Sequence, residues 1–168
     1  EQLTSKESKP ANNVPEAATG WEMDQWYYSG YKLQADPVKA FNAEFLDVSS
    51  LDLESPFKWD AFTPLSPTGA ESRGLTEGDH LVDAPENSVY YVAKVFEVKE
   101  AGIYELEMDS DDLMKVWINR NVVHSFRYGG RGLQFQGRDV VETWLDKGPN
   151  IVLIKIINGM SQTGFYFE

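Results

Sequence analysis

The stretch that decides the fold is residues 102–123, which read GIYELEMDSDDLMKVWINRNVV. Apolar residues alternate with polar ones over 104–108 and again over 116–118, which is the period of a strand with one buried face. Asp109, Asp111 and Asp112 crowd the connection between these two predicted strands. Three carboxylates so close together repel one another, so this loop holds a hard cation, faces hydrogen-bond donors or is solvated.

Further strands are predicted on both sides of this stretch. The segment 89–98 alternates like the first, 138–145 forms another strand, and 119–121 reads as a hairpin turn. Residues 151–157, IVLIKII, are apolar at both parities, which predicts a central strand covered on both faces, and the chain closes on GFYFE with Phe165 and Phe167 inward. The pattern predicts an all-β fold, an antiparallel β-sandwich of jelly-roll type.

Earlier parts of the chain add less regular elements. A first strand is expected in the aromatic segment 21–31, and residues 49–86 are expected to be mostly loops with short strands near 57–62 and 80–82. One short helix is expected within 36–48, where Asp36 is a suitable N-cap and Pro37 the first helical residue.

Composition bounds the classes of function. The 168 residues suffice for one domain, expected over 21–168, and the polar residues 1–20 are predicted to be a disordered linker or tether, or a frayed terminus. A net charge of -12 opposes nucleic acid and anionic lipid, and no apolar run approaches the roughly 20 residues of a membrane span. No export signal is present, so a secreted, periplasmic or cell-surface location requires that a signal was removed before Glu1. The absence of cysteine excludes disulfides and thiolate sites.

The segment 89–168 resembles a known group of modules. It contains a YYVAKVFEV strand, a predicted AGIYELEMDSDDLMKVWINRNVVH hairpin, the pair Arg131-Gly132, a WLDKGPNIVLIKI strand pair and the closing GFYF. In these elements it resembles the non-catalytic jelly-roll modules of PA14-type and galactose-binding-like domains, which occur beside glycoside-active enzymes and in bacterial surface proteins. The resemblance implies a carbohydrate-binding or carbohydrate-enzyme-associated module whose partner is a carbohydrate or a neighbouring catalytic domain.

The same resemblance implies a cation. In PA14-type lectins a pair of aspartates binds calcium, which in turn binds sugar hydroxyls, and the matching positions here are Asp111 and Asp112. Leu113 stands where glycine is usual in the family, and no second calcium loop is recognised in the sequence. The alternative is that the aspartates bond backbone amides and fix the turn, and no cofactor other than calcium is expected.

Aromatic rings that face solvent can stack on sugar rings while amides and carboxylates bind the hydroxyls. Trp117 and Asn119 share a strand face that alternation turns away from the core, so both are candidate ligand-binding residues, unless a long loop buries Trp117. The other four tryptophans are expected in the core or anchoring loops: Trp21, Trp26, Trp59 and Trp144.

Arg127, Arg131 and Arg138 flank the glycine-rich segment FRYGGRGLQFQGRD in an acidic protein. Arg127 and Arg131 are therefore candidates for binding an acidic sugar or a carboxylate. The alternative is that the arginines bridge to the acidic segment 109–112.

Catalysis is not expected. His80 and His124 stand alone, without the spacing of a metal motif or a nucleophile elbow, and GGRG lacks the strand-to-helix context of a phosphate loop. We therefore predict a non-catalytic carbohydrate-binding module, with a spacer sandwich that contacts another protein domain as the alternative.

Overall fold

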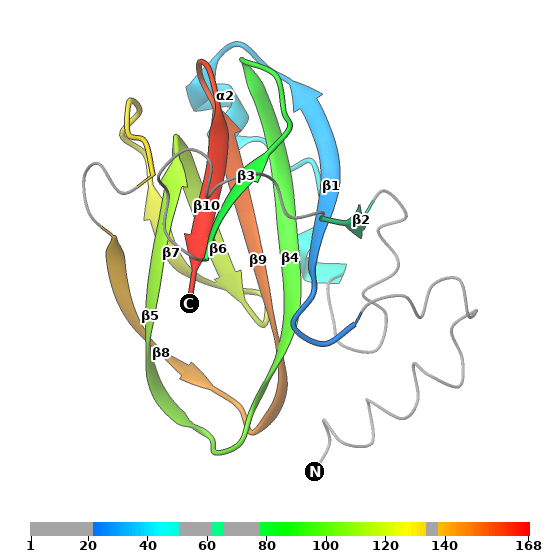
Figure 1. Ribbon diagram of the computed structural model, residues 1–168, viewed down its shortest axis with the longest axis vertical. Helices are drawn as coiled ribbons and strands as arrows, with labels where there is room; N and C mark the ends of the chain where they lie inside the picture. Colours follow the sequence, from blue (N-terminus) through cyan, green and yellow to red (C-terminus); the bar gives the residue numbers. More distant parts are fainter. Residues whose placement is uncertain (1–21, 51–61, 66–77, 134–137) are drawn as a thin grey trace.

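The computed structural model describes residues 22–50, 62–65, 78–133 and 138–168, in which two antiparallel sheets stack as a β-sandwich (Figure 1). The larger sheet has six strands, in the order β2 (Thr63–Pro64), β1 (Trp26–Leu33), β4 (Ser88–Val98), β9 (Gly148–Asn158), β6 (Leu113–Ile118) and β7 (Asn121–Phe126). The smaller sheet has four, in the order β3 (Asp79–Val82), β10 (Thr163–Phe167), β5 (Gly102–Asp111) and β8 (Asp139–Leu145). The predicted all-β sandwich is confirmed. The predicted tether and residues 57–61 of the strand predicted near 57–62 lie outside the described residues. Phe62 is described and is not in a strand, and the short strand β2 follows it at Thr63–Pro64.

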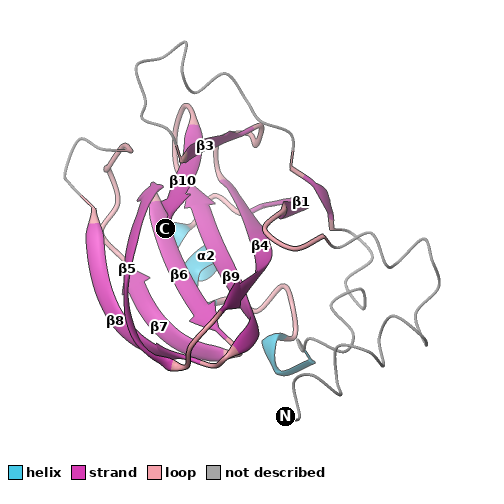
Figure 2. Cartoon of the chain, turned by 60° about the horizontal axis from the view of Figure 1, so that its bottom comes forward, coloured by secondary structure: helices cyan, strands magenta, loops and turns pink. Residues whose placement is uncertain are grey.

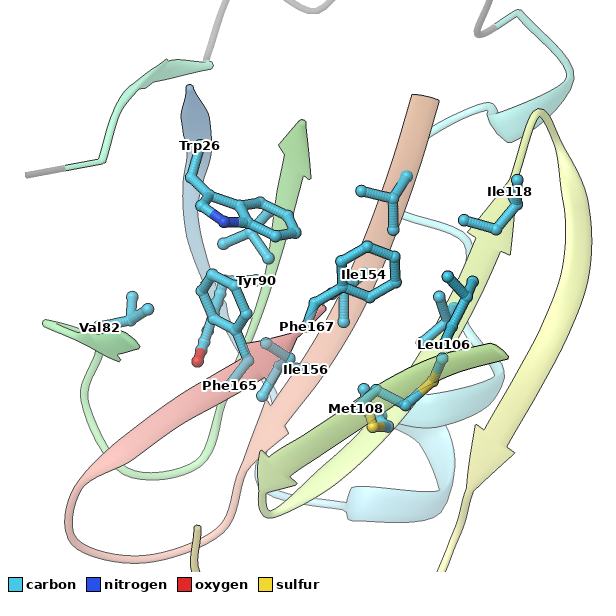
Figure 3. Close-up of a cluster of buried hydrophobic side chains, with 14 of the residues drawn as sticks. Trp26, Val82, Tyr90, Leu106, Met108, Ile118, Ile154, Ile156, Phe165 and Phe167 are labelled. Carbon is cyan, nitrogen blue, oxygen red and sulfur yellow. The ribbon is translucent and has the colours of Figure 1, made fainter. Parts of the chain in front are cut away.

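The core between the sheets follows from strand alternation. Every second residue of β9, including Ile154 and Ile156, points from the large sheet toward Leu106 and Met108 of β5 (Figure 3). Phe165 of β10 joins them and is fully buried, as its position in GFYFE predicts. Each such side chain contributes roughly 1.5–3 kcal/mol through burial, so this layer is the main stabilising element of the sandwich.

Strand β9 is the central strand that its apolar sequence predicts, because β4 and β6 pair with its two edges and both of its faces are covered. Its outer face lies under the segment that contains α2 (Pro37–Asn42) and the 3-10 helix η2 (Val48–Ser50) (Figure 2). Asp36 caps α2, since its Oδ1 accepts from the backbone N–H groups of Val38 and Lys39 at 2.9 and 3.1 Å. The predicted short helix is confirmed.

The strand pairing differs from the expectation in two places. The acidic segment does not connect a hairpin: β5 pairs with β8 and β10, whereas β6 pairs with β7 and β9 in the other sheet. The turn after β8 likewise leads into the other sheet, where β9 pairs with β4 and β6. Alternation indicates which face of a strand is buried, but it does not indicate which strand pairs with it. The hairpin at 119–121 is confirmed, with β6 and β7 paired and positive φ angles of 47° and 74° at Asn119 and Arg120.

One end of the sandwich brings together segments that are distant in sequence. The crossing from β5 to β6, the loop between β9 and β10, and α2 all lie at the upper end in Figure 1. None of the helices in the described part of the chain has the length and apolar character of a membrane-spanning helix.

Candidate functional site

The crossing between the sheets is built from Asp111, the last residue of β5, and Asp112, which precedes β6. The peptide bond between them is cis. The pKa of Asp111 is raised to about 7, first by burial and then by the charge of Asp112 and a hydrogen bond with its side chain. The two carboxyl groups therefore abut, and the metal-free site favours retention of a proton near neutral pH.

The loop between β9 and β10 lies against this pair. The backbone N–H of Gly159 donates to Asp112 Oδ2 at 2.9 Å, and the hydroxyl of Thr163 donates to the carbonyl oxygen of Asp111. Tyr90 Oη and Thr163 Oγ1 lie 2.9 Å apart in the buried space beneath. This is a second loop at the acidic pair, which the sequence interpretation did not identify. The Asn158-Gly159 pair at the end of a long apolar strand was the available signal for a turn.

Asn158 supplies an unused oxygen at this end of the sandwich. Its side chain is fully buried, and Nδ2 donates to the carbonyl oxygens of Ala84, Pro85 and Ser161. Within the described residues, its Oδ1 accepts no hydrogen bond. A buried acceptor without a partner costs about 1–3 kcal/mol, so this oxygen is a site for an added cation or donor.

The oxygen atoms at this end fit a hard cation by their chemistry. Two carboxylates and an amide oxygen, together with the carbonyl groups of the loop, are the donors that calcium takes in proteins. Across the described ranges, no three His, Cys, Asp or Glu side chains gather at one point in a metal-binding arrangement. A cation at Asp111 and Asp112 would therefore depend on amide and carbonyl oxygens and on added ligands.

The structural alternative for the acidic segment holds for two of its members. Asp112 accepts from Gly159 N, and Asp109 Oδ1 accepts from Ser110 N at 2.9 Å. Asp111 differs from the expected turn-fixing role, because burial first and then the charge of Asp112 raise the pKa of its carboxyl group.

This difference gives a prediction about Asp111. Because its pKa in the fold, about 7, lies above the ordinary 3.8, its contribution to stability is complete below about pH 4 and is lost as the pH rises through 7. Asp111→Asn should therefore stabilise the metal-free protein by about 1–2 kcal/mol at pH 8, a value discounted for the partial exposure of the group. Urea unfolding in EDTA at pH 4 and pH 8 measures the difference, which should be small at pH 4. A variant that is less stable than the wild type at pH 8 would show that Asp111 is a structural anchor.

The two predictions for the arginines, ligand binding and a bridge to the acidic segment, have different outcomes. Arg131 is 3% exposed, and its Nε lies 3.4 Å from Oδ1 of the fully buried Asp109. Its other nitrogens reach Asp139 Oδ2 at 2.8 Å and Ser110 Oγ at 3.2 Å, and Arg138 lies 4.0 Å from Asp109. The predicted bridge between the arginines and the acidic segment is confirmed for Arg131 and Arg138. It reaches Asp109 rather than the Asp111-Asp112 pair, which leaves that pair without an arginine partner within the described residues.

Trp117 and Asn119 lie away from this end of the sandwich. Trp117 is on the outer face of its sheet, as alternation predicts, but the segment from Phe45 to Val48 packs on its cluster and leaves it 8% exposed. Its ring therefore offers no open face for stacking. Asn119 is held by the framework, since Nδ2 donates to Asn150 Oδ1 at 2.8 Å and Oδ1 accepts from Ile151 N at 2.9 Å.

Among the three tryptophans that the structure describes, Trp144 is the one that faces solvent. It is 57% exposed, which corrects its expected place in the core, and its Nε1 donates to Asp146 Oδ1 at 3.1 Å, so the loop-anchoring expectation holds. Trp26 is buried in the core as predicted, whereas Trp21 and Trp59 lie outside the described residues.

The two histidines contact a carboxylate and an aromatic ring, respectively. His124 Nε2 lies 2.8 Å from Asp139 Oδ2. His80 stacks on Phe165 with ring centroids 4.9 Å apart, and burial lowers its pKa. The absence of catalysis stays a prediction.

Comparison with known proteins gives distant likenesses. No family model matches the sequence, and no curated protein matches it. One similar solved structure is a beta-glucosidase from Kluyveromyces marxianus in complex with glucose, with 10% identity and a TM-score of 0.45 over 84% of this chain and 15% of that one. Another is a GH31 alpha-xylosidase from Xanthomonas citri, with 12% identity and a TM-score of 0.36 over 86% of this chain and 13% of that one. The chain thus spans a small part of either enzyme, and with both TM-scores below 0.5 neither likeness assigns a family or an activity.

Proposed function

We propose that this domain is a non-catalytic carbohydrate-binding module that holds a calcium ion at Asp111 and Asp112 and binds sugar hydroxyls there. The observation that carries the proposal is the abutting carboxyl pair, with the pKa of Asp111 raised to about 7. It lies at the end of the sandwich where Asn158 Oδ1 has no hydrogen-bond partner among the described residues. The sequence resemblance to PA14-type modules at Asp111 and Asp112 supports the same assignment.

The chemistry of the site explains why a sugar is the proposed ligand. Calcium takes six to eight oxygen ligands, more than two carboxylates and one amide provide, and it coordinates neighbouring hydroxyl groups readily. Asp111 is only partly buried, so the pair is open to solvent on one side. A module of this kind would hold a neighbouring catalytic domain on its polysaccharide, in a secreted or surface protein.

Calcium should raise the melting temperature of the wild type. A ligand at one hundred times its dissociation constant stabilises by about 2.7 kcal/mol, or about 5–10 °C for a domain of this size. Asp111→Asn and Asp112→Asn should abolish the shift, because each removes a charged ligand. The control Glu105→Gln, which removes an exposed carboxylate from the same strand, should leave it unchanged.

A glycan array measured with calcium and with EDTA completes the test. Binding to neutral glycans in calcium but not in EDTA supports the proposal. If calcium leaves the melting temperature unchanged and no glycan binds in either condition, the proposed function is wrong.

The second function, contact with another protein domain, has its own support in an exposed patch on the small sheet. Ile103 of β5 and Trp144 of β8 are paired in register, and both side chains face solvent. Glu105 and Glu142 are the next outward pair, so the patch is apolar with an acidic border. Such a surface suits a neighbouring domain with apolar and basic side chains. The negative outcome of the calcium and glycan tests favours this function.

A further inference from the structure

A pocket of about 260 Å³ lies between α2 and the segment that follows β7, on the outer face of the large sheet. Phe41 and Leu113 are its buried floor, and Val38, which is 66% exposed, stands on its rim. Asn42 and Arg127 are its polar lining residues. The pocket thus combines an apolar base with one cation and one amide.

The surroundings of this pocket are positive, although the protein carries a net charge of -12. The guanidinium carbon of Arg127 lies 5.0 Å from the centre of the Phe41 ring, and Lys115 Nζ lies 6.0 Å from it. Lys155 Nζ donates to the carbonyl oxygen of Phe41 at 2.9 Å. In the part of the chain that the structure describes, none of these three cations makes a salt bridge.

Two of the three cations, Lys115 and Lys155, repel each other. The pKa of Lys155 is lowered to about 8, first by burial and then by the charge of Lys115. Asp36, which precedes the pocket, directs its carboxylate to the first N–H groups of α2. Glu44 acts on Lys155 in the opposite sense, so Lys115 and Arg127 are the cations left to attract an anion bound beside Arg127.

Leu113 places the floor of the pocket next to the acidic pair. It follows Asp112 directly, and its side chain packs with Phe41, Ala40, Val89 and Ile157 in a small cluster. A glycine at position 113 would remove this part of the pocket floor. The departure from the PA14-type pattern at Leu113 therefore coincides with a pocket floor next to the proposed calcium site.

We propose that this pocket binds the carboxylate of an acidic sugar, which pairs with Arg127 while the apolar face of the sugar ring lies on Phe41 and Leu113. The guanidinium group matches a carboxylate through two parallel hydrogen bonds, and Asn42 offers an amide to a hydroxyl group. The inference rests on the proposed function only for the carbohydrate class of the ligand, because the pocket contains neither Asp111 nor Asp112.

Calorimetric titration in EDTA tests the pocket without the calcium site. The wild type should bind a galacturonate trisaccharide at least tenfold more tightly than the matched galactose trisaccharide, and 0.5 M NaCl should weaken that binding. Arg127→Gln should lower the affinity for the acidic sugar about tenfold or more, the effect of losing a charge-assisted hydrogen bond. Arg120→Gln, which removes an exposed arginine at the far end of β6, should have no effect.

Further arms identify the ligand chemistry and separate the two proposals. Val38→Trp, an exposed position on the rim, should block the acidic sugar by filling the pocket. Inorganic phosphate or acetate that competes with the trisaccharide at equal concentration would overturn the assignment to a sugar, as would equal affinity for the neutral trisaccharide or an unchanged Arg127→Gln. If Asp111→Asn still binds the acidic sugar, this inference holds even where the calcium response is absent. Arg127→Gln should lose acidic-sugar binding and keep calcium-dependent binding to neutral glycans.

Discussion

Replacing Arg131 with methionine is expected to lower the free energy of unfolding by about 3 kcal/mol. The change removes the guanidinium group that lies 3.4 Å from the fully buried Asp109 and leaves that carboxylate with Arg138 at 4.0 Å. Breaking a buried ion pair typically costs about 3–5 kcal/mol, and the lower value applies because Arg138 remains. Methionine keeps part of the packing on Phe126, over whose ring the guanidinium lies at 3.7 Å. Urea unfolding at pH 7 measures the loss.

Two further variants give this result its meaning. Arg120→Met, at an exposed turn, should change the stability by less than about 0.5 kcal/mol. Combining Arg131→Met with Asp109→Asn should recover more than half of the loss, because the buried charge goes with its partner. A loss below 1 kcal/mol in the single variant would mean that water screens the pair.

The faces of the strands were predictable from the sequence because burial imposes a period of two. The apolar run 151–157 predicted the central position of β9, and Phe165 and Phe167 point inward as expected. The partners of the strands were not predictable in this way. The segments on either side of Asp112 alternate as a hairpin would, yet they belong to different sheets, because pairing is decided by contacts distant in sequence.

The candidate site shows the same division. Asp111 and Asp112 were singled out by the crowding of carboxylates over 109–112 together with the resemblance to PA14-type modules. The distant loop after Asn158 was not identified, because only the fold brings it to them. Alternation correctly placed Trp117 on the outer face of its sheet. It gave no information about the segment after α2 that buries the ring, or about the exposure of Trp144.

Replacing Gly164 with alanine is expected to cost about 2–3 kcal/mol of stability, because the added carbon has no space. A Cβ at this position would lie 2.4 Å from the carbonyl oxygen of His80 and 2.9 Å from Leu133 Cδ1. The oxygen belongs to the backbone of β3, so β3 must move away from β10, and no rotation of a side chain relieves the contact. Gly129→Ala is the matched control, since its Cβ would lie 3.6 Å from Leu113 Cδ1 at an ordinary contact distance.

The clash at Gly164 should also reach the acidic pair. Gly164 stands in register with Leu81 on one side and with Asp111 on the other, and Thr163 before it donates to the carbonyl oxygen of Asp111. A displacement of β10 therefore moves the loop that lies against Asp112. We expect Gly164→Ala to weaken the calcium-induced rise in melting temperature while Gly129→Ala preserves it. A Gly164→Ala protein with wild-type stability and a full calcium response would show that β3 yields without disturbing the site. Loss of the response in both variants would show that it depends on the segment after β7 instead.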